Sequence, residues 1–169
     1  MTELRTTTDA DCSIAIEYPS AHATMPDLEL DIGAHYRWFR FRYDFLAKVV
    51  AAGVQRSCRL RRPYFSSRLW LFDDNSQETF FWKPNFLTGS SFWTMQGEKI
   101  GELKTTSLSG QEMVLRDCRC NAIATISLVK SMSKRKEFKA QVPSGFDIRL
   151  LLGWMTLEFY DDIYGYVAS

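Results

Sequence analysis

The sequence predicts one β-rich α+β domain made of antiparallel hairpins, with a single buried helix near the C-terminus. Three pairs of short apolar segments flank turn-forming residues, and one continuous apolar run at 146–159 follows them. Aromatic residues make up 14% of the chain, and aromatic side chains favour pleated, half-buried surfaces. At 169 residues the chain is long enough to bury one core without staples.

Residues 1–31 differ from the rest of the chain in composition. They are rich in Thr, Ser, Ala and Asp, and Pro19 and Pro26 interrupt them. Within this segment, a short strand over 14–18 is the alternative to an irregular arm. We expect an N-terminal arm over 1–31 that lies on the domain or on a partner, and a barrel domain over 32–169.

Period-two alternation begins after His35. The inward set of the predicted strand is Phe39, Phe41, Tyr43 and Phe45, and the outward set is Arg40, Arg42 and Asp44. The apolar run at 46–54 continues this segment and ends near Gly53. We therefore predict one strand over 36–45 with one face inward.

Three hairpins follow, each centred on turn residues. The predicted strand pairs are 69–72 with 79–82, 91–95 with 99–103, and 112–115 with 122–128. The intervening residues are Asp-, Asn-, Ser- or Gly-containing turns. Short strands at this spacing indicate a meandering antiparallel sheet or a barrel.

The apolar run at 146–159 is predicted to be a buried helix. Ser144 and Asp147 resemble a capping box with Asp in place of Glu. A membrane span needs about 20 apolar residues, and this shorter run is bounded by Arg149 and Glu158. A glycine costs a helix about 1 kcal/mol relative to alanine, so Gly153 suggests a close approach by a neighbouring strand.

Several short motifs follow one another along the chain. They are Arg62-Pro63-Tyr64, Leu69-x-Leu-x-Asp73 with Gln77-Glu78 and Lys83-Pro84, Gly97-x-x-Ile-Gly101-x-Leu103, and Phe138-x-x-Gln141-x-Pro143-x-x-x-Asp147-Ile-Arg149. In this order they resemble the phospholipid scramblase family, within the tubby-like and LURP-one-related superfamily, and the resemblance covers roughly 36–164. The resemblance implies a closed antiparallel tubby-like β-barrel around a central C-terminal apolar helix.

The chain departs from the scramblase pattern where that family handles calcium and lipid anchors. The family's acidic, calcium-associated run corresponds to 131–137, which holds one Glu among three bases. Calcium takes several oxygen ligands, usually carboxylates, so we expect no calcium site. The family's cysteine-rich palmitoylation stretch and its Pro-rich extension are also missing from this sequence.

Net charge, the first residues and the cysteine content each count against particular classes of protein. The net charge is +1, so nothing global attracts nucleic acid or an anionic membrane, and only local charge clusters can do so. The first residues lack the features of a secretory signal or a typical transit peptide. The four cysteines suggest no disulfide framework, and Cys118 and Cys120 lack the partners of a zinc site. We expect an intracellular protein, cytoplasmic and peripheral to membranes or mitochondrial, with no metal and no cofactor.

Two basic clusters are the candidate lipid- or phosphate-binding residues. They are Arg56, Arg59, Arg61 and Arg62, and Lys134, Arg135, Lys136 and Lys139 with nearby Lys130. Tubby-like domains bind phosphoinositide headgroups through basic side chains, which the resemblance implies here. Arginine forks suit phosphate. The alternatives are a solvated loop or an acidic protein partner.

No catalytic residues are predicted. The pairs Asp73-Asp74 and Asp161-Asp162 have no nearby base, and His35 has no distinguishing partner. We find no nucleophile–base constellation in the sequence and expect no enzymatic activity. Core packing is the simplest interpretation of Trp38, Trp70, Trp82, Trp93 and Trp154, rather than a stacking platform for nucleic acid.

These observations lead to two main functional hypotheses. The first is a non-catalytic scramblase-like domain that binds anionic phospholipid headgroups or protein partners peripherally. The second is a structural or accessory subunit whose 1–31 arm and barrel face dock into a larger assembly, for which a mitochondrial complex is one candidate. Phospholipid scrambling is the remote alternative.

Overall fold

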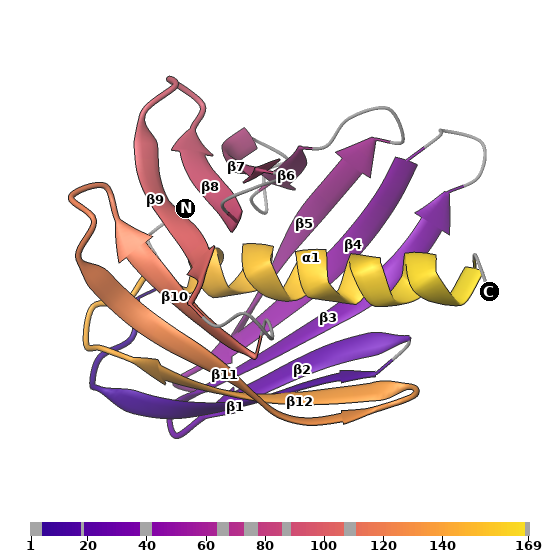
Figure 1. Ribbon diagram of the computed structural model, residues 1–169, viewed down its shortest axis with the longest axis horizontal. Helices are drawn as coiled ribbons and strands as arrows, with labels where there is room; N and C mark the ends of the chain where they lie inside the picture. The colour runs from indigo at the N-terminus through magenta and orange to yellow at the C-terminus, as the bar shows by residue number, and fades with distance from the viewer. Residues whose placement is uncertain are drawn as a thin grey trace.

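The computed structural model describes residues 5–17, 19–37, 42–63, 68–72, 78–85, 89–106 and 111–167, with side chains described except at 35–37, 42, 78, 80, 84, 85, 89, 90 and 161–167. Within these ranges, alternating buried and exposed side chains build twelve β-strands, and one α-helix follows them. The strands close into an antiparallel barrel, and the helix runs through its interior (Figure 1). The expected closed antiparallel barrel and its C-terminal apolar helix are therefore confirmed.

The elements have the following bounds. They are β1 (Ala10–Glu17), β2 (Ser20–Met25), β3 (Leu28–Arg37), β4 (Arg42–Ala51), β5 (Val54–Pro63), β6 (Leu69–Phe72), β7 (Glu78–Asn85), β8 (Gly89–Thr94), β9 (Lys99–Thr105), β10 (Glu112–Asp117), β11 (Ala122–Met132), β12 (Arg135–Val142) and α1 (Ile148–Val167).

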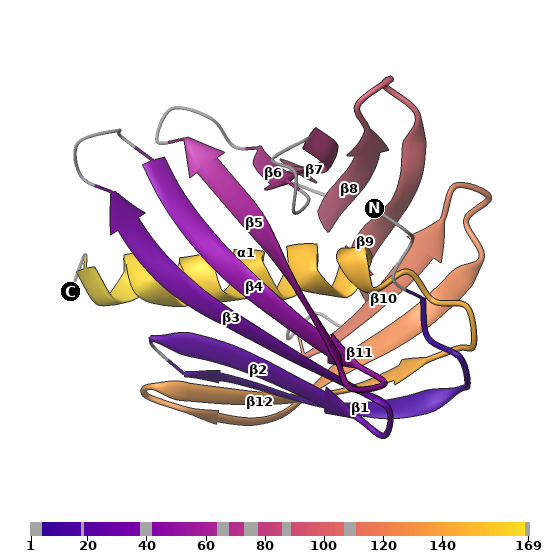
Figure 2. The ribbon, with the colours of Figure 1, turned by 180° about the vertical axis from the view of Figure 1, so that it is seen from behind.

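Each strand pairs with the next along the chain, and β12 returns to pair with β1 over its full length. Antiparallel neighbours reverse direction, so all odd-numbered strands finish at the same end of the barrel. α1 starts at the opposite end, where β12 finishes, and its C-terminal part lies where the odd-numbered strands finish (Figures 1 and 2). We call these the helix-start end and the helix-finish end.

The core is formed by α1 and the inward rows of the strands. In the reverse view, β3, β4 and β5 cross in front of α1 (Figure 2). The Phe138 ring meets Trp154 edge to face with 5.1 Å between ring centroids. Full burial of a large apolar side chain contributes about 1.5–3 kcal/mol. The buried apolar residues of the helix are Ile148, Leu150, Leu151, Leu152, Trp154, Met155 and Phe159.

The start of α1 differs from the predicted capping box. Asp147 is the N-cap, because its Oδ1 accepts a hydrogen bond from the backbone N–H of Arg149 at 3.0 Å. The Oγ of Ser144 instead donates to the carbonyl of Thr7 at 3.0 Å. The helix therefore begins at Ile148 rather than 146, and it continues past 159 to Val167.

The close approach expected at Gly153 comes from a side chain rather than from a strand backbone. A Cβ at this position would overlap the indole Nε1 of Trp82, which projects inward from β7. Trp82 is only 1% exposed. Glycine at this position therefore makes room for the indole against the helix axis.

The predicted arm over 1–31 is wrong, because most of it belongs to the barrel wall. β1, β2 and the start of β3 lie in this segment, and β1 completes the barrel by pairing with both β2 and β12. Pro19 and Pro26 lie in the turns between these strands. The inward residues of β1 and β2 are Cys12, Ile14, Ile16, Ala21, Ala23 and Met25. Four of these are small or sulfur-bearing, so the alternation is weak in the sequence.

The single strand predicted over 36–45 is also wrong, because β3 ends at Arg37 and β4 begins at Arg42. Tyr36 pairs with Tyr43 across this hairpin. The strand residues on both sides of the reversal alternate with the same period, which hides the reversal. The residues between the two strands, 38–41, lie outside the described ranges.

All three predicted hairpins are confirmed, as β6–β7, β8–β9 and β10–β11. Beyond the segment assigned to the arm, two further strands were not predicted, β5 and β12. Both carry many Arg and Lys side chains, and these obscure the inward apolar rows at Cys58 and Leu60 and at Phe138, Ala140 and Val142.

Candidate functional site

The first basic cluster lies on β5, where the period of the strand divides it between the two sides of the barrel wall. Leu60 is fully buried in the interior, so Arg56 and Arg62 share its inward parity. Arg59 and Arg61 have the outward parity. Arg56 and Arg62 also lie near opposite ends of the strand. These four arginines are adjacent in sequence but do not form one site.

Arg61 and Arg62 contact groups of the protein itself. The Arg62 guanidinium lies 3.9 Å from the ring centroid of Tyr160 on α1. Arg61 Nε donates to Asp44 Oδ1 at 3.1 Å, and the Arg61 guanidinium lies 4.8 Å from the ring centroid of Phe72. Such cation–π contacts each contribute about 0.5–1 kcal/mol or more. Arg62 thus belongs to the rim at the helix-finish end, and Arg61 belongs to the outer wall.

The second basic cluster lies on the β11–β12 hairpin. Arg135 donates to Glu17 at 3.0 Å and to Glu137 at 2.8 Å. These hydrogen bonds, led by the one to Glu17, raise the pKa of Arg135 above its ordinary value. Arg135 therefore links β1 to β12 as an ion-pair residue. Lys130 and Lys134 are exposed and carry the outward charge of the hairpin.

Members of both basic clusters lie at the helix-finish end of the barrel. Its basic residues from the two clusters are Arg61, Arg62, Lys130, Lys134, Arg135 and Lys136. Arg59 and Lys139 lie in mid-strand, and Arg56 lies toward the helix-start end. Four strands separate β5 from β12 in one direction, and five separate β5 from β11 in the other. The two groups therefore occupy opposite sides of one rim.

Two exposed apolar side chains accompany the lysines on the β11–β12 hairpin. Val129 is 56% exposed and Met132 is 47% exposed. The strand register shifts between Leu128 and Lys130, which leaves Val129 as the extra residue of a β-bulge. The hairpin points toward the same side as the C-terminal end of α1 (Figure 1). The sequence analysis missed this pair, although Val129 directly precedes Lys130 and Met132 follows it by two residues.

The tryptophans divide between the core and the surface. Trp82 and Trp154 are 1% exposed, as core packing predicts. The prediction is wrong for Trp70 and Trp93, which are half-buried on the outward side of β6 and β8. Buried residues precede both on their strands, so period-two alternation along the strand is the signal that distinguishes these outward tryptophans from the core tryptophans. Trp38 lies outside the described residues.

A hydroxyl, an imidazole and a carboxylate meet on the outward face of β2 and β3. His22 Nδ1 lies 2.5 Å from Asp31 Oδ1, and Thr24 Oγ1 lies 2.9 Å from His22 Nε2. The sequence analysis found no such constellation because Asp31 comes from the neighbouring strand. A nucleophile also needs donors for the developing oxyanion. Thr24 sits between Ser13 and Glu29 on the outer face of the barrel, where the neighbouring backbone N–H groups are hydrogen-bonded within the β-ladders.

The cysteines fall into two environments. Cys12 and Cys58 are buried, and burial raises the pKa of the Cys12 thiol to about 12. Cys118 and Cys120 are exposed in the β10–β11 turn. Asp117 organises this turn by accepting hydrogen bonds from the backbone N–H groups of Asn121 and Arg119, and its pKa is lowered chiefly by the bond from Asn121. Within the described ranges no three potential metal ligands come together.

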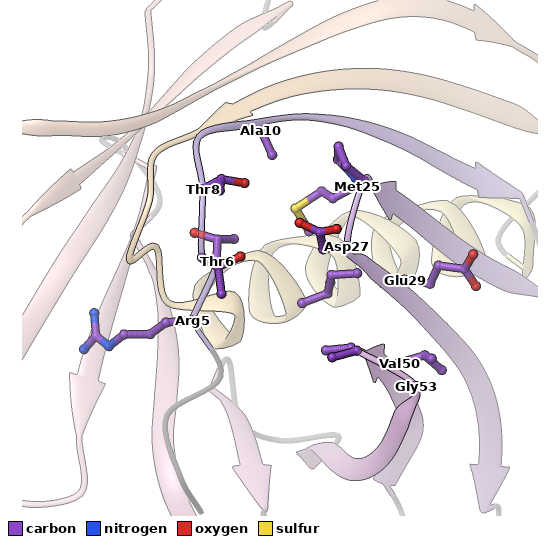
Figure 3. Close-up of a pocket in the computed structure, with 14 residues that line it drawn as sticks. Arg5, Thr6, Thr8, Ala10, Met25, Asp27, Glu29, Val50 and Gly53 are labelled. Atoms are coloured by element: carbon purple, nitrogen blue, oxygen red, sulfur yellow. The ribbon is translucent and has the colours of Figure 1, made fainter.

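A cleft of about 550 Å³ lies at the helix-start end, between the N-terminal segment and the β2–β3 and β4–β5 turns. Thr6 and Thr8 line one side, and Asp27 and Val50 lie on others (Figure 3). The side chain of Arg5 points away from the cleft, and its guanidinium donates to the carbonyl of Gly145 at 2.9 Å. The cleft therefore presents the carboxylates of Asp27 and Glu29 beside threonine hydroxyls, and these carboxylates repel an anionic ligand.

Three candidates of the sequence analysis cannot be placed. Asp73 and Asp74 lie outside the described residues, as do the side chains of Asp161, Asp162 and His35.

Among the residues that are described, no helix combines the length and apolar character needed to cross a bilayer. No protein-family model, no curated protein and no solved structure matches this chain.

Proposed function

We propose that this chain is a non-catalytic, scramblase-like domain of the tubby-like type that binds anionic phospholipid headgroups with the helix-finish end of its barrel. One observation carries the proposal. Lys130, Lys134 and Lys136 gather on a hairpin of this end together with exposed Val129 and Met132.

This arrangement suits a planar anionic surface. Each Lys or Arg held near an anionic membrane contributes about 1 kcal/mol. Exposed apolar side chains among them enter the boundary between headgroups and acyl chains, while the long lysine stems keep their charges in water. Arg62, on the opposite side of the rim, can meet the same surface.

The carboxylates at the β11–β12 hairpin are paired with an arginine, which supports lipid binding without calcium. Its described carboxylate, Glu137, is hydrogen-bonded to Arg135. Glu17 on the adjacent strand is held by the same arginine. A calcium site needs several oxygen ligands, and both carboxylates are already occupied by a fixed cation. We therefore propose binding that is independent of calcium.

Vesicle flotation of the full chain tests this function. The vesicles are phosphatidylcholine alone, phosphatidylcholine with phosphatidylserine, and phosphatidylcholine with a phosphoinositide, each at low and moderate salt with EDTA. We expect flotation with the anionic vesicles only, weakening as salt rises because exposed charges are screened. No flotation with any anionic vesicle at low salt contradicts the proposal.

A pair of charge reversals locates the binding surface. Removal of two lysine contacts costs about 2 kcal/mol, so Lys130→Glu with Lys134→Glu is expected to weaken binding by about thirtyfold or more. Arg116→Glu with Arg119→Glu makes an equal change in net charge beside the β10–β11 turn, at the helix-start end. Equal losses in both variants would assign the binding to net charge rather than to this hairpin.

A further inference from the structure

The outer wall over β4 to β8 carries a group of arginines and aromatic rings that the proposed lipid-binding hairpin does not use. The strand register places Arg61 beside Trp70, Trp70 beside Phe81, and Phe81 beside Trp93. A second row places Arg59 beside Phe72. We call this surface the arginine–aromatic face, and it consists of Arg59, Arg61, Arg68, Trp70, Phe72, Phe81, Lys83 and Trp93.

The rings of this face point away from the barrel interior. Trp70, Phe81 and Trp93 are half-buried, and each precedes or follows a buried residue on its strand. The indole Nε1 of Trp93 donates to Ser91 Oγ on the same outward row at 2.8 Å. Exposed Leu46 extends the face toward β4, where it pairs with Arg59. Tryptophan and arginine are enriched among the residues that dominate protein–protein binding energy.

Two arginines of this face place their guanidinium groups over its aromatic rings. Arg68 lies 4.9 Å from the ring centroid of Phe81 and 6.0 Å from that of Trp70, and these two rings pack with centroids 5.0 Å apart. Arg61 covers Phe72 in the same way. A base of single-stranded nucleic acid would have to displace these guanidinium groups to stack. A stacked guanidinium still presents N–H groups at its edge, which match a carboxylate in geometry.

The charge of the face selects an acidic partner. Among its described side chains are the cations Arg59, Arg61, Arg68 and Lys83. The described acid beside them is Asp44, which binds Arg61 and is itself largely buried. Asp44 shows the ligand type that this face accepts, a carboxylate against a ring-stacked guanidinium. The face therefore complements a segment that alternates carboxylates with apolar side chains.

We propose that the arginine–aromatic face binds an acidic, aromatic- or leucine-containing segment of a partner protein. The face is on the side wall at β4–β8, whereas the lysine hairpin is at β11–β12 on the other side of the barrel. Both surfaces can therefore be occupied together. The domain would then hold an acidic protein segment beside an anionic membrane.

Selection from a random 16-residue peptide-display library on the immobilised full chain tests the proposal. We expect enriched peptides to combine Asp or Glu with aromatic or aliphatic residues. In fluorescence anisotropy, the most enriched peptide should bind the Arg59→Glu, Arg68→Glu variant at least tenfold more weakly than the unmodified chain. Lys130→Glu with Lys134→Glu, an equal charge change on the opposite side, should alter its affinity less than twofold.

Three results would overturn the proposal. The first is enrichment of peptides without acidic residues, or no enrichment. The second is an equal loss of affinity in the two charge-reversal variants. The third is tighter binding of a 16-nucleotide oligothymidylate than of the selected peptide, which would assign the face to single-stranded nucleic acid. Matching thermal unfolding of all variants ensures that lost binding does not reflect lost folding.

Discussion

Gly153→Ala is expected to destabilise the protein, although alanine is the better helix former. Helix propensity alone predicts a gain of about 1 kcal/mol. The added Cβ, however, would overlap the indole ring of Trp82, which is 1% exposed. Overpacking of a dense core costs about 1–3 kcal/mol, and a buried indole without room to move puts this site near 3. The net loss is therefore about 2 kcal/mol, or a fall in Tm of about 4–8 °C for a chain of this size.

Thermal and urea unfolding, followed by circular dichroism, measure this change. Gly33→Ala is the control, because nothing lies within 4 Å of a Cβ built at this β3 position. We expect the control to be neutral or slightly stabilising. The loss at Gly153 should also shrink in the Trp82→Phe background, where the ring is smaller. A Tm for Gly153→Ala at or above that of the unmodified chain would refute the close packing of the Trp82 indole against Gly153 of α1.

Three further predictions test the core, the thiols and one turn. Leu151→Lys should abolish folding, because Leu151 is fully buried and an unpaired ammonium there costs more than the whole stability of a typical domain; a stable, folded variant would contradict the central helix. In native protein at pH 8, a thiol reagent should label Cys118 and Cys120 rapidly and spare Cys12 and Cys58, with all four reacting in denaturant; rapid labelling of Cys12 would argue against its burial and its raised pKa of about 12. The lowered pKa of Asp117 means that its contribution to stability is present above the unfolded pKa of about 3.9 and is lost as pH falls through the lower folded pKa. The difference in urea midpoint between the unmodified chain and Asp117→Asn should therefore be present at pH 6 and disappear at strongly acidic pH, whereas a difference that persists there would assign it to another cause.

Local periodicity was sufficient for the elements whose signal lies within a few residues. The three hairpins β6–β7, β8–β9 and β10–β11 follow from short apolar runs around turn residues. The buried helix follows from an apolar run too short for a membrane and flanked by charges. In both cases the chain neighbours alone carry the pattern, so the prediction needs no knowledge of distant contacts.

The candidate site was predicted only in part, because exposure depends on strand parity and on partners far away in sequence. Arg61 and Arg62 are consecutive, yet one binds Asp44 on the outer wall and the other stacks on Tyr160 at the rim. The pairing of Arg135 with Glu17 joins residues at the two ends of the chain. Counting bases along the sequence cannot distinguish a lysine that faces solvent from an arginine held in an ion pair.

The sequence by itself determined the β-rich class, the predicted hairpins and the burial of the C-terminal apolar run, since each depends on side-chain period and length. Only the tertiary structure decided that residues 10–31 complete the barrel wall, that Trp70 faces outward while Trp82 faces α1, and that members of the two basic clusters lie on opposite sides of one rim. The physical reason is closure. A barrel forms when β1 pairs with β12, and that long-range pairing decides which side of each strand is buried.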